Sequence, residues 1–137
     1  MLGGILRKEA RPNMLKALRI LLAEDERTIS RLIRQVLTSA GHEVIGVQTA
    51  ADAIANLKAG SFDLILLDLN LADGDGFRVV DAVRLMAGDN TAPVPVLLMT
   101  GEHHFEDNDP RMAQVSGVLW KPFALDDLER AVGRFSA

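Results

Sequence analysis

The sequence contains no cysteine, which excludes disulfides, thiolate metal sites and thiol catalysis. It has no apolar run near the ~20 residues that a membrane helix needs, and its N-terminus lacks a signal-peptide core. Positive charge is not in excess either. The net charge of −4 argues against a nucleic-acid binder, whose affinity would depend on lysine and arginine. We therefore expect a cytoplasmic protein with no direct nucleic-acid contact and no membrane insertion.

The length of 137 residues fits one domain with a substantial core, and 48% hydrophobic and 25% charged residues are ordinary for a globular protein. Residues 1–16 are predicted to form a basic, flexible leader, with Met14 as an alternative start. Residues 17–137 are predicted to form the domain. Because the last predicted helix ends at the end of the chain, we expect no DNA-binding or enzymatic output domain, although a chain cut from a longer protein is an open alternative.

Apolar runs alternate with segments of helical periodicity along the whole domain. Strands are predicted over Leu18–Ala23, Glu43–Val47, Phe62–Leu67, Val94–Met99 and Gly117–Trp120. Helices are predicted from Ile29 to a stop at Gly41, from a Thr49 cap to Gly60, from Phe77 to Met86, over Arg111–Val115, and from Leu125 to Phe135. This alternation predicts a single doubly wound α/β fold, with a five-stranded parallel sheet and helices on both faces.

Polar residues that could carry chemistry stand where four of these strands end. They are Glu24 and Asp25, Asp68, Thr100, and Lys121. Because the carboxyl ends of parallel strands form one edge of a sheet, these residues are expected to meet there.

Three acids and one amine in one place indicate phosphoryl chemistry with a metal ion. Carboxylates are the oxygen ligands that Mg²⁺ prefers, and the Asn70 backbone carbonyl could be a further ligand. One Mg²⁺ and the Lys121 ammonium would balance the three negative charges. Asp68 could then attack a phosphoryl group and form an acyl phosphate. Lys121, the Thr100 hydroxyl and the Gly101 N–H could contact its oxygens afterwards.

Four motifs carry a resemblance to a known family. They are Glu24-Asp25, the run from Leu66 through Asp68 to Phe77, Met99-Thr100-Gly101, and Trp120-Lys121-Pro122-Phe123. Together they resemble the receiver domain of two-component response regulators, from Leu18 to the C-terminus. The resemblance implies the flavodoxin-like strand order 2-1-3-4-5 and a phosphorylatable signalling switch that is not an enzyme beyond its own phosphoryl transfer and dephosphorylation.

The same resemblance implies a role for each matching residue. Asp68 is the phosphoacceptor, and Mg²⁺ is bound by Glu24, Asp25, Asp68 and the Asn70 carbonyl. Thr100 is the switch hydroxyl, and Lys121 contacts the phosphate and precedes a cis proline. Asn70 and Glu102 match two variable positions that are associated with brief phosphorylation in chemotaxis regulators. The implied partners are a histidine kinase or phosphotransfer protein and a downstream protein target.

The chain departs from the family pattern at two positions. Ala72 stands where the family often has proline, and Val118 stands where it usually has the aromatic residue that turns inward when the threonine moves. Trp120 is two residues after Val118 in the same predicted strand, and side chains alternate between the faces of a sheet, so both should face the same side. We expect Trp120 either to report or gate the surface of helix 4, strand 5 and helix 5, or to pack beneath the last helix. The segment from Gly101 to Pro110 does not follow the usual pattern of helix 4.

Two other functions are alternatives to the switch. The first is a docking receiver with little phosphorylation-dependent switching, which the Val118 departure motivates. The second is a Mg²⁺-dependent phosphatase of the haloacid dehalogenase type. That class needs a second aspartate two residues after the nucleophile, where this chain has Asn70.

Overall fold

A computed structural model describes residues 16–88, 92–101 and 109–136. Its strands are β1 (Arg19–Ala23), β2 (Glu43–Val47), β3 (Leu64–Leu67), β4 (Asn70–Leu71), β5 (Gly74–Asp75), β6 (Val96–Thr100) and β7 (Gly117–Trp120). Its helices are α2 (Arg27–Ser39), α3 (Ala50–Ala59), α4 (Phe77–Ala87), the 3₁₀ helix η2 (Pro110–Gln114) and α5 (Leu125–Gly133).

The main sheet has five strands in the order β2-β1-β3-β6-β7, and all neighbouring strands pair in parallel. This is the predicted order 2-1-3-4-5 when the two short strands β4 and β5 are set aside. β3 lies at the centre, as its continuous apolar sequence indicates, because a strand covered on both faces has no polar side to show to solvent.

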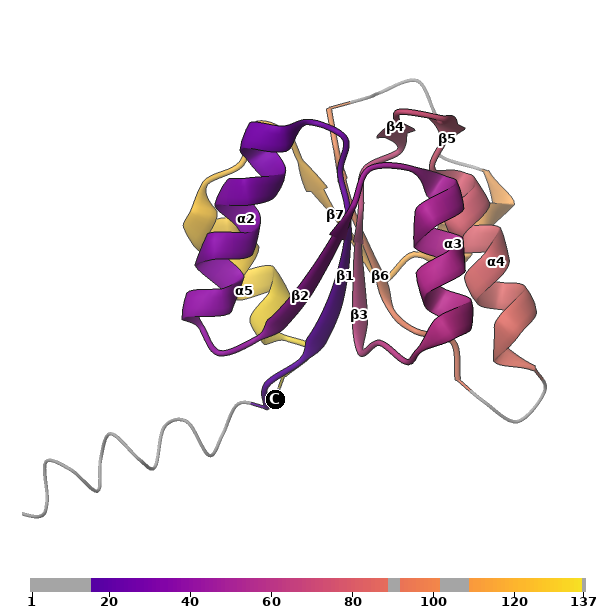
Figure 1. Cartoon of the computed structure of the whole chain (residues 1–137), viewed down its shortest axis with the longest axis horizontal. Coiled ribbons are helices and arrows are strands. Elements are labelled where there is room, and N and C mark those ends of the chain that lie inside the picture. Colours follow the sequence, from indigo (N-terminus) through magenta and orange to yellow (C-terminus); the bar gives the residue numbers. More distant parts are fainter. Residues whose placement is uncertain (1–15, 89–91, 102–108, 137) are drawn as a thin grey trace, which may run out of the picture.

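Helices cover both faces of the sheet, with α2 and α5 on one side and α3 and α4 on the other (Figure 1). Successive strand residues point to opposite faces, so Leu21 belongs to the α3/α4 core and Leu22 to the α2/α5 core, each with no exposed surface. Burying a leucine in this way stabilises the fold by about 1.5–3 kcal/mol. The two cores hold the strand ends rigidly at one edge.

Most residues that were predicted to end or cap a helix do so in the structure. Gly41 follows α2 with a φ of 98°, a left-handed conformation that glycine adopts without strain. The Thr49 side chain accepts a hydrogen bond from the Asp52 N–H at 3.0 Å and caps α3. The cap of α2 was not predicted. It is Glu26, whose carboxylate accepts the Thr28 N–H at 3.0 Å.

Several boundaries differ from the prediction by one or two residues. β3 begins at Leu64, and β6 runs from Val96 to Thr100, just after Pro95, which has no N–H to donate to a ladder. η2 begins at Pro110 and is a 3₁₀ turn, where the sequence predicted a helix over Arg111–Val115. α5 ends at Gly133, and Phe135 packs on the core from beyond the helix.

The glycine-rich stretch after β3 forms a small antiparallel hairpin, β4–β5, where the sequence predicted only a loop. The hairpin stands at the carboxyl edge of the sheet (Figure 1). The leader is described only from Lys16 onward, and Glu102 also lies outside the described residues. The division into 1–16 and 17–137 stays a prediction.

Candidate functional site

The strand ends predicted to carry chemistry meet at one edge of the sheet. In the register of the sheet Ala23 pairs with Leu67, so Glu24 and Asp68 follow adjacent strands at the same level. On the other side Thr100 pairs with Trp120, and Lys121 follows directly.

The three predicted acids form a cluster. Glu24, Asp25 and Asp68 each offer a carboxylate oxygen, and these oxygens lie within 4.8 Å of one another. Glu24 is fully buried and Asp68 is 5% exposed, whereas Asp25 is more open to solvent. A buried carboxylate is costly unless a cation or hydrogen bonds compensate its charge, so this cluster requires positive charge.

Lys121 supplies part of that charge. Its Nζ donates to Glu24 Oε1 at 2.5 Å and to Asp68 Oδ2 at 2.8 Å. The Lys121 N–H also donates to the Thr100 carbonyl at 2.9 Å, and the Lys121–Pro122 peptide is cis, as the family resemblance implied. One side chain therefore bridges two of the acids across the edge of the sheet.

The backbone fixes the remaining oxygens of both carboxylates. Asp68 Oδ1 accepts the Asn70 N–H at 2.9 Å, and Glu24 Oε2 accepts the Glu26 N–H at 3.2 Å. Each buried acid is thus held through one oxygen by the backbone and through the other by Lys121. The site is pre-organised around carboxylates whose orientation is set.

The ionisation of the site reflects burial and mutual repulsion. Burial raises the pKa of Glu24, and the negative charge of Asp68 raises it further, although the hydrogen bond from Lys121 opposes both effects. Burial alone would lower the pKa of Lys121, but the hydrogen bonds and charges of Asp68 and Glu24 outweigh it, so the pKa of Lys121 is raised. Lys121 is therefore an ammonium ion at neutral pH.

Thr100 is fully buried at the end of β6, and Gly101 follows it at the surface beside Lys121. A Cβ on Gly101 would meet Lys121 Cβ at 3.6 Å, which is ordinary contact, so space alone does not require glycine here. Their predicted contacts to a phosphoryl group stay predictions, as does the modulating role of Glu102.

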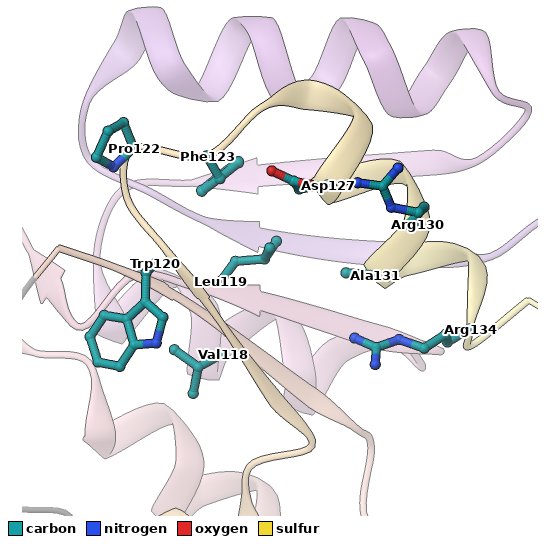
Figure 2. A pocket seen from close by; sticks show the side chains of 9 residues that line it. All are labelled: Val118, Leu119, Trp120, Pro122, Phe123, Asp127, Arg130, Ala131 and Arg134. Carbon is teal, nitrogen blue, oxygen red and sulfur yellow. Dashed lines mark hydrogen bonds and ion pairs between the residues drawn. The ribbon is translucent and has the colours of Figure 1, made fainter.

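Val118 and Trp120 lie on the same side of β7, and Leu119 points the other way, toward α5 (Figure 2). This arrangement is expected, because successive side chains of a strand point to opposite faces of the sheet. Val118 packs on the α3/α4 core. Trp120 is 44% exposed, so the interpretation in which it packs beneath the last helix is wrong. It borders a groove between β7 and α5, and the groove has a volume of about 680 Å³.

Two charged side chains for which the sequence predicted no role connect distant segments of the chain. Asp73, at the tip of the β4–β5 hairpin, accepts N–H groups from the start of α3. Arg111, on η2, lies 4.3 Å from the centre of the Phe77 ring and pairs with Asp109 at 3.0 Å. An acid within a glycine-rich turn was a signal for the first. The sequence contains no signal for the role of Arg111, because its contact with Phe77 joins distant segments.

Comparison with known proteins places the chain in a family. Residues 20–133 match the model of the response regulator receiver domain, and the chain belongs to that family. It is 37% identical over 110 residues to the swarming motility regulation protein RssB of Serratia marcescens. It is 35% identical over 114 residues to the transcriptional regulatory protein TcrA of Mycobacterium tuberculosis. Each alignment covers 80% of this chain but only 48% and 42% of the relative, so the chain spans less than half the length of these curated relatives.

Solved receiver domains have the same fold. The signal receiver domain of a LuxO repressor protein from Vibrio parahaemolyticus matches with a TM-score of 0.75 and 28% identity, over 87% of this chain and 89% of its own. The receiver domain of a sensor histidine kinase from Pseudomonas aeruginosa, with magnesium coordinated in its active-site cleft, matches with a TM-score of 0.74 and 28% identity, over 87% and 97%. None of the helices in the described part of the chain combines the length and the apolar composition that a membrane span requires.

Proposed function

We propose that this receiver domain is a phosphorylatable switch in which Asp68 accepts a phosphoryl group from a phosphohistidine on a histidine kinase or phosphotransfer protein. The observation that carries the proposal is the Lys121 ammonium, which contacts both Asp68 and Glu24 at the carboxyl edge of the sheet. A lysine that merely lay on the surface would not bridge two buried acids from distant parts of the sequence.

The donor set fits a magnesium ion. When ionised, the three carboxylates and the Lys121 ammonium leave two negative charges in the cluster, and carboxylate oxygens suit Mg²⁺. Glu24, Asp25, Asp68 and the Asn70 carbonyl would hold the ion. When bound, Mg²⁺ supplies neutralising charge to the oxygens of the transferring phosphoryl group.

The residues of the chain divide the chemistry as follows. An Asp68 oxygen attacks phosphorus, the P–N bond of the phosphohistidine breaks, and its electron pair stays on the imidazole, which then takes a proton from solvent. Lys121 exchanges a carboxylate oxygen for a phosphoryl oxygen, and the Thr100 hydroxyl and Gly101 N–H donate to the others. Attack of water on phosphorus later releases phosphate and restores Asp68.

The output would be a change in the surface that receiver domains form from the fourth helix, fifth strand and fifth helix of the family, of which the strand and the last helix are β7 and α5 here, together with the exposed Trp120. Lys121 is covalently adjacent to Trp120, so a shift of the ammonium toward a phosphoryl group bears on this surface directly. A downstream protein would be bound or released there. The domain would act as a cytoplasmic switch and not as a turnover enzyme.

The proposal that Asp68 accepts a phosphoryl group is tested by incubating the protein with Mg²⁺ and an acyl phosphate and measuring its intact mass. We expect a gain of one phosphoryl group in the wild type and in Asp126→Ala, which removes an exposed acid on α5, but not in Asp68→Ala. Labelling of Asp68→Ala to the same extent would overturn the proposal. Repeated hydrolysis of phosphate monoesters would indicate the phosphatase instead, for which Asn70 stands in place of the second aspartate.

The docking receiver with little switching keeps one supporting observation, the aliphatic Val118 packed on the core. The two candidates differ in a binding experiment on an identified downstream protein. Equal affinity for wild type and Asp68→Asn, with and without the phosphodonor, would favour the docking receiver.

A further inference from the structure

The hairpin that follows the phosphoacceptor is anchored at its tip to a helix from another part of the chain. Asp73 Oδ1 accepts the Ala50 N–H at 2.8 Å, and Asp73 Oδ2 accepts the Ala51 N–H at 3.0 Å. Ala50 and Ala51 are the first residues of α3, whose N–H groups have no partner within the helix. The carboxylate thus occupies the positive end of α3, where a negative charge is favoured.

Two further contacts support the same anchor. The Ala72 N–H donates to the Gln48 carbonyl at 3.3 Å, next to the start of α3, and Arg78 lies 3.5 Å from Asp73 Oδ2. Hydrogen bonds from the Ala50 and Ala51 N–H groups lower the pKa of Asp73, so it is ionised at neutral pH and its two bonds are charge-assisted.

The base of the hairpin is part of the candidate metal site. In β4–β5, Asn70 pairs with Asp75, and the Asn70 N–H donates to Asp68. The hairpin strands are only two residues long, too short to be stable alone. The base of the hairpin is held by the Gly76 N–H, which donates to the Leu69 carbonyl at 2.9 Å, and by the buried Leu71, whereas its tip is held by Asp73.

We infer that Asp73 is a positioning residue for the divalent cation: by fixing the hairpin tip to the start of α3, it orients the Asn70 carbonyl toward the acid cluster. This inference rests on the proposed function, since it presumes that Mg²⁺ binds at that cluster. Groups that orient metal ligands from outside the site typically change metal affinity by about 10–100-fold when they are removed.

The test is calorimetric titration of the unphosphorylated full chain with MgCl₂. Asp73→Ala and Asp73→Glu are expected to weaken binding by about tenfold. The glutamate keeps the negative charge but has one more methylene, so it displaces the hairpin relative to α3. Thr49→Ala removes a different hydrogen bond to the same helix end, and Asp52→Asn removes one negative charge there. Both controls are expected to bind Mg²⁺ within about twofold of the wild type, because neither touches the hairpin.

The outcomes distinguish the positioning role of Asp73 from the proposed metal site itself. Loss of affinity in both Asp73 variants but in neither control supports the positioning role. Asp73→Ala and Asp52→Asn could instead lose equal Mg²⁺ affinity, with Asp73→Glu unchanged and the losses removed by high salt. Asp73 would then act only through its long-range negative charge, and the positioning role would be overturned. Wild-type affinity in Asp73→Ala would also overturn it while leaving the metal site intact. Failure of the wild type itself to bind Mg²⁺ would overturn the proposed function together with this inference. If Asp73→Ala does not fold, Asp73→Glu alone decides.

Discussion

Replacing Lys121 with methionine tests the electrostatics of the site directly. The variant keeps a side chain of similar length but leaves the Glu24 and Asp68 carboxylates without their shared ammonium. Removing one partner of a buried ion pair costs about 3–5 kcal/mol. Because the Lys121 side chain is 20% exposed, solvent screens part of this effect, and we expect a loss of about 2–3 kcal/mol in the free energy of unfolding without Mg²⁺.

Magnesium should affect the two proteins unequally. Lys121 Nζ is 2.8 Å from Asp68 Oδ2, and Mg²⁺–oxygen distances are about 2.1 Å, so an ion bound to that oxygen would lie within about 5 Å of the ammonium. Even at the dielectric constant of water, the repulsion between the divalent ion and the ammonium at this separation is about 1.7 kcal/mol, which corresponds to more than tenfold in Mg²⁺ affinity. Lys121→Met should therefore bind Mg²⁺ about tenfold more tightly.

The two effects combine in one assay. At a Mg²⁺ concentration about 100 times the wild-type Kd, the wild type gains about 2.7 kcal/mol and the variant about 4.1 kcal/mol. Urea unfolding with and without Mg²⁺ should thus show the variant's deficit shrinking by about 1.4 kcal/mol, the difference between those gains. Lys58→Met, which removes the same charge from the exposed end of α3, is the matched control. A deficit of equal size in both conditions would refute the idea that Lys121 competes with the cation for the acids.

Three further predictions concern other parts of the molecule. The Nδ1 of His42 accepts the Leu18 N–H at 3.0 Å, and burial lowers the pKa of His42 below its ordinary value of 6.5. The neutral imidazole therefore contributes its full stability at a pH above 6.5, and this contribution is lost as the pH falls below 6.5. In His42→Asn, whose amide oxygen can accept the same N–H without titrating, the melting temperature should fall less between about pH 7.5 and pH 5.5. Gly76→Ala should lose about 2–3 kcal/mol in urea unfolding, because a Cβ there would lie 2.5 Å from the Asp68 carbonyl oxygen; unchanged stability would show that the backbone yields. Arg111→Met should lose about 1 kcal/mol of unfolding free energy with the cation–π contact to the ring at the start of α4, and an equal loss in Arg111→Lys would show that the planar guanidinium is not required.

The sequence predicted the sheet well because its strands are covered on both faces. Runs such as Leu64–Leu67 are continuously apolar, and every side chain of this strand is buried, as is every side chain of Val96–Thr100. The acid cluster was predictable for a related reason. In a parallel sheet the order of strands fixes which strand ends are neighbours, so Glu24, Asp68 and Lys121 could be brought together before any coordinates.

What the sequence did not predict depends on contacts with no local signature. The β4–β5 strands are too short to show a periodicity, so they were predicted as a loop. The reach of Asp73 to α3 depends on where two crossovers place their ends. The same holds for the double contact of Lys121, since the sequence indicated that the amine lies near the acids but not which oxygens it contacts.

The proposed link from the site to the surface would run through Trp120, the only tryptophan of the chain. The ammonium that contacts Asp68 belongs to the next residue, and Trp120 is 44% exposed beside the groove between β7 and α5 (Figure 2). If Lys121 leaves Glu24 for a phosphoryl oxygen, we expect the end of β7 to adjust and the solvent contact of the indole to change with it. We therefore expect Mg²⁺ with beryllofluoride, a phosphoryl mimic, to alter Trp120 fluorescence in the wild type and in Lys58→Met but not in Lys121→Met. Unchanged fluorescence in the wild type, with beryllofluoride bound by an independent measure, would mean that this tryptophan neither reports nor gates the surface.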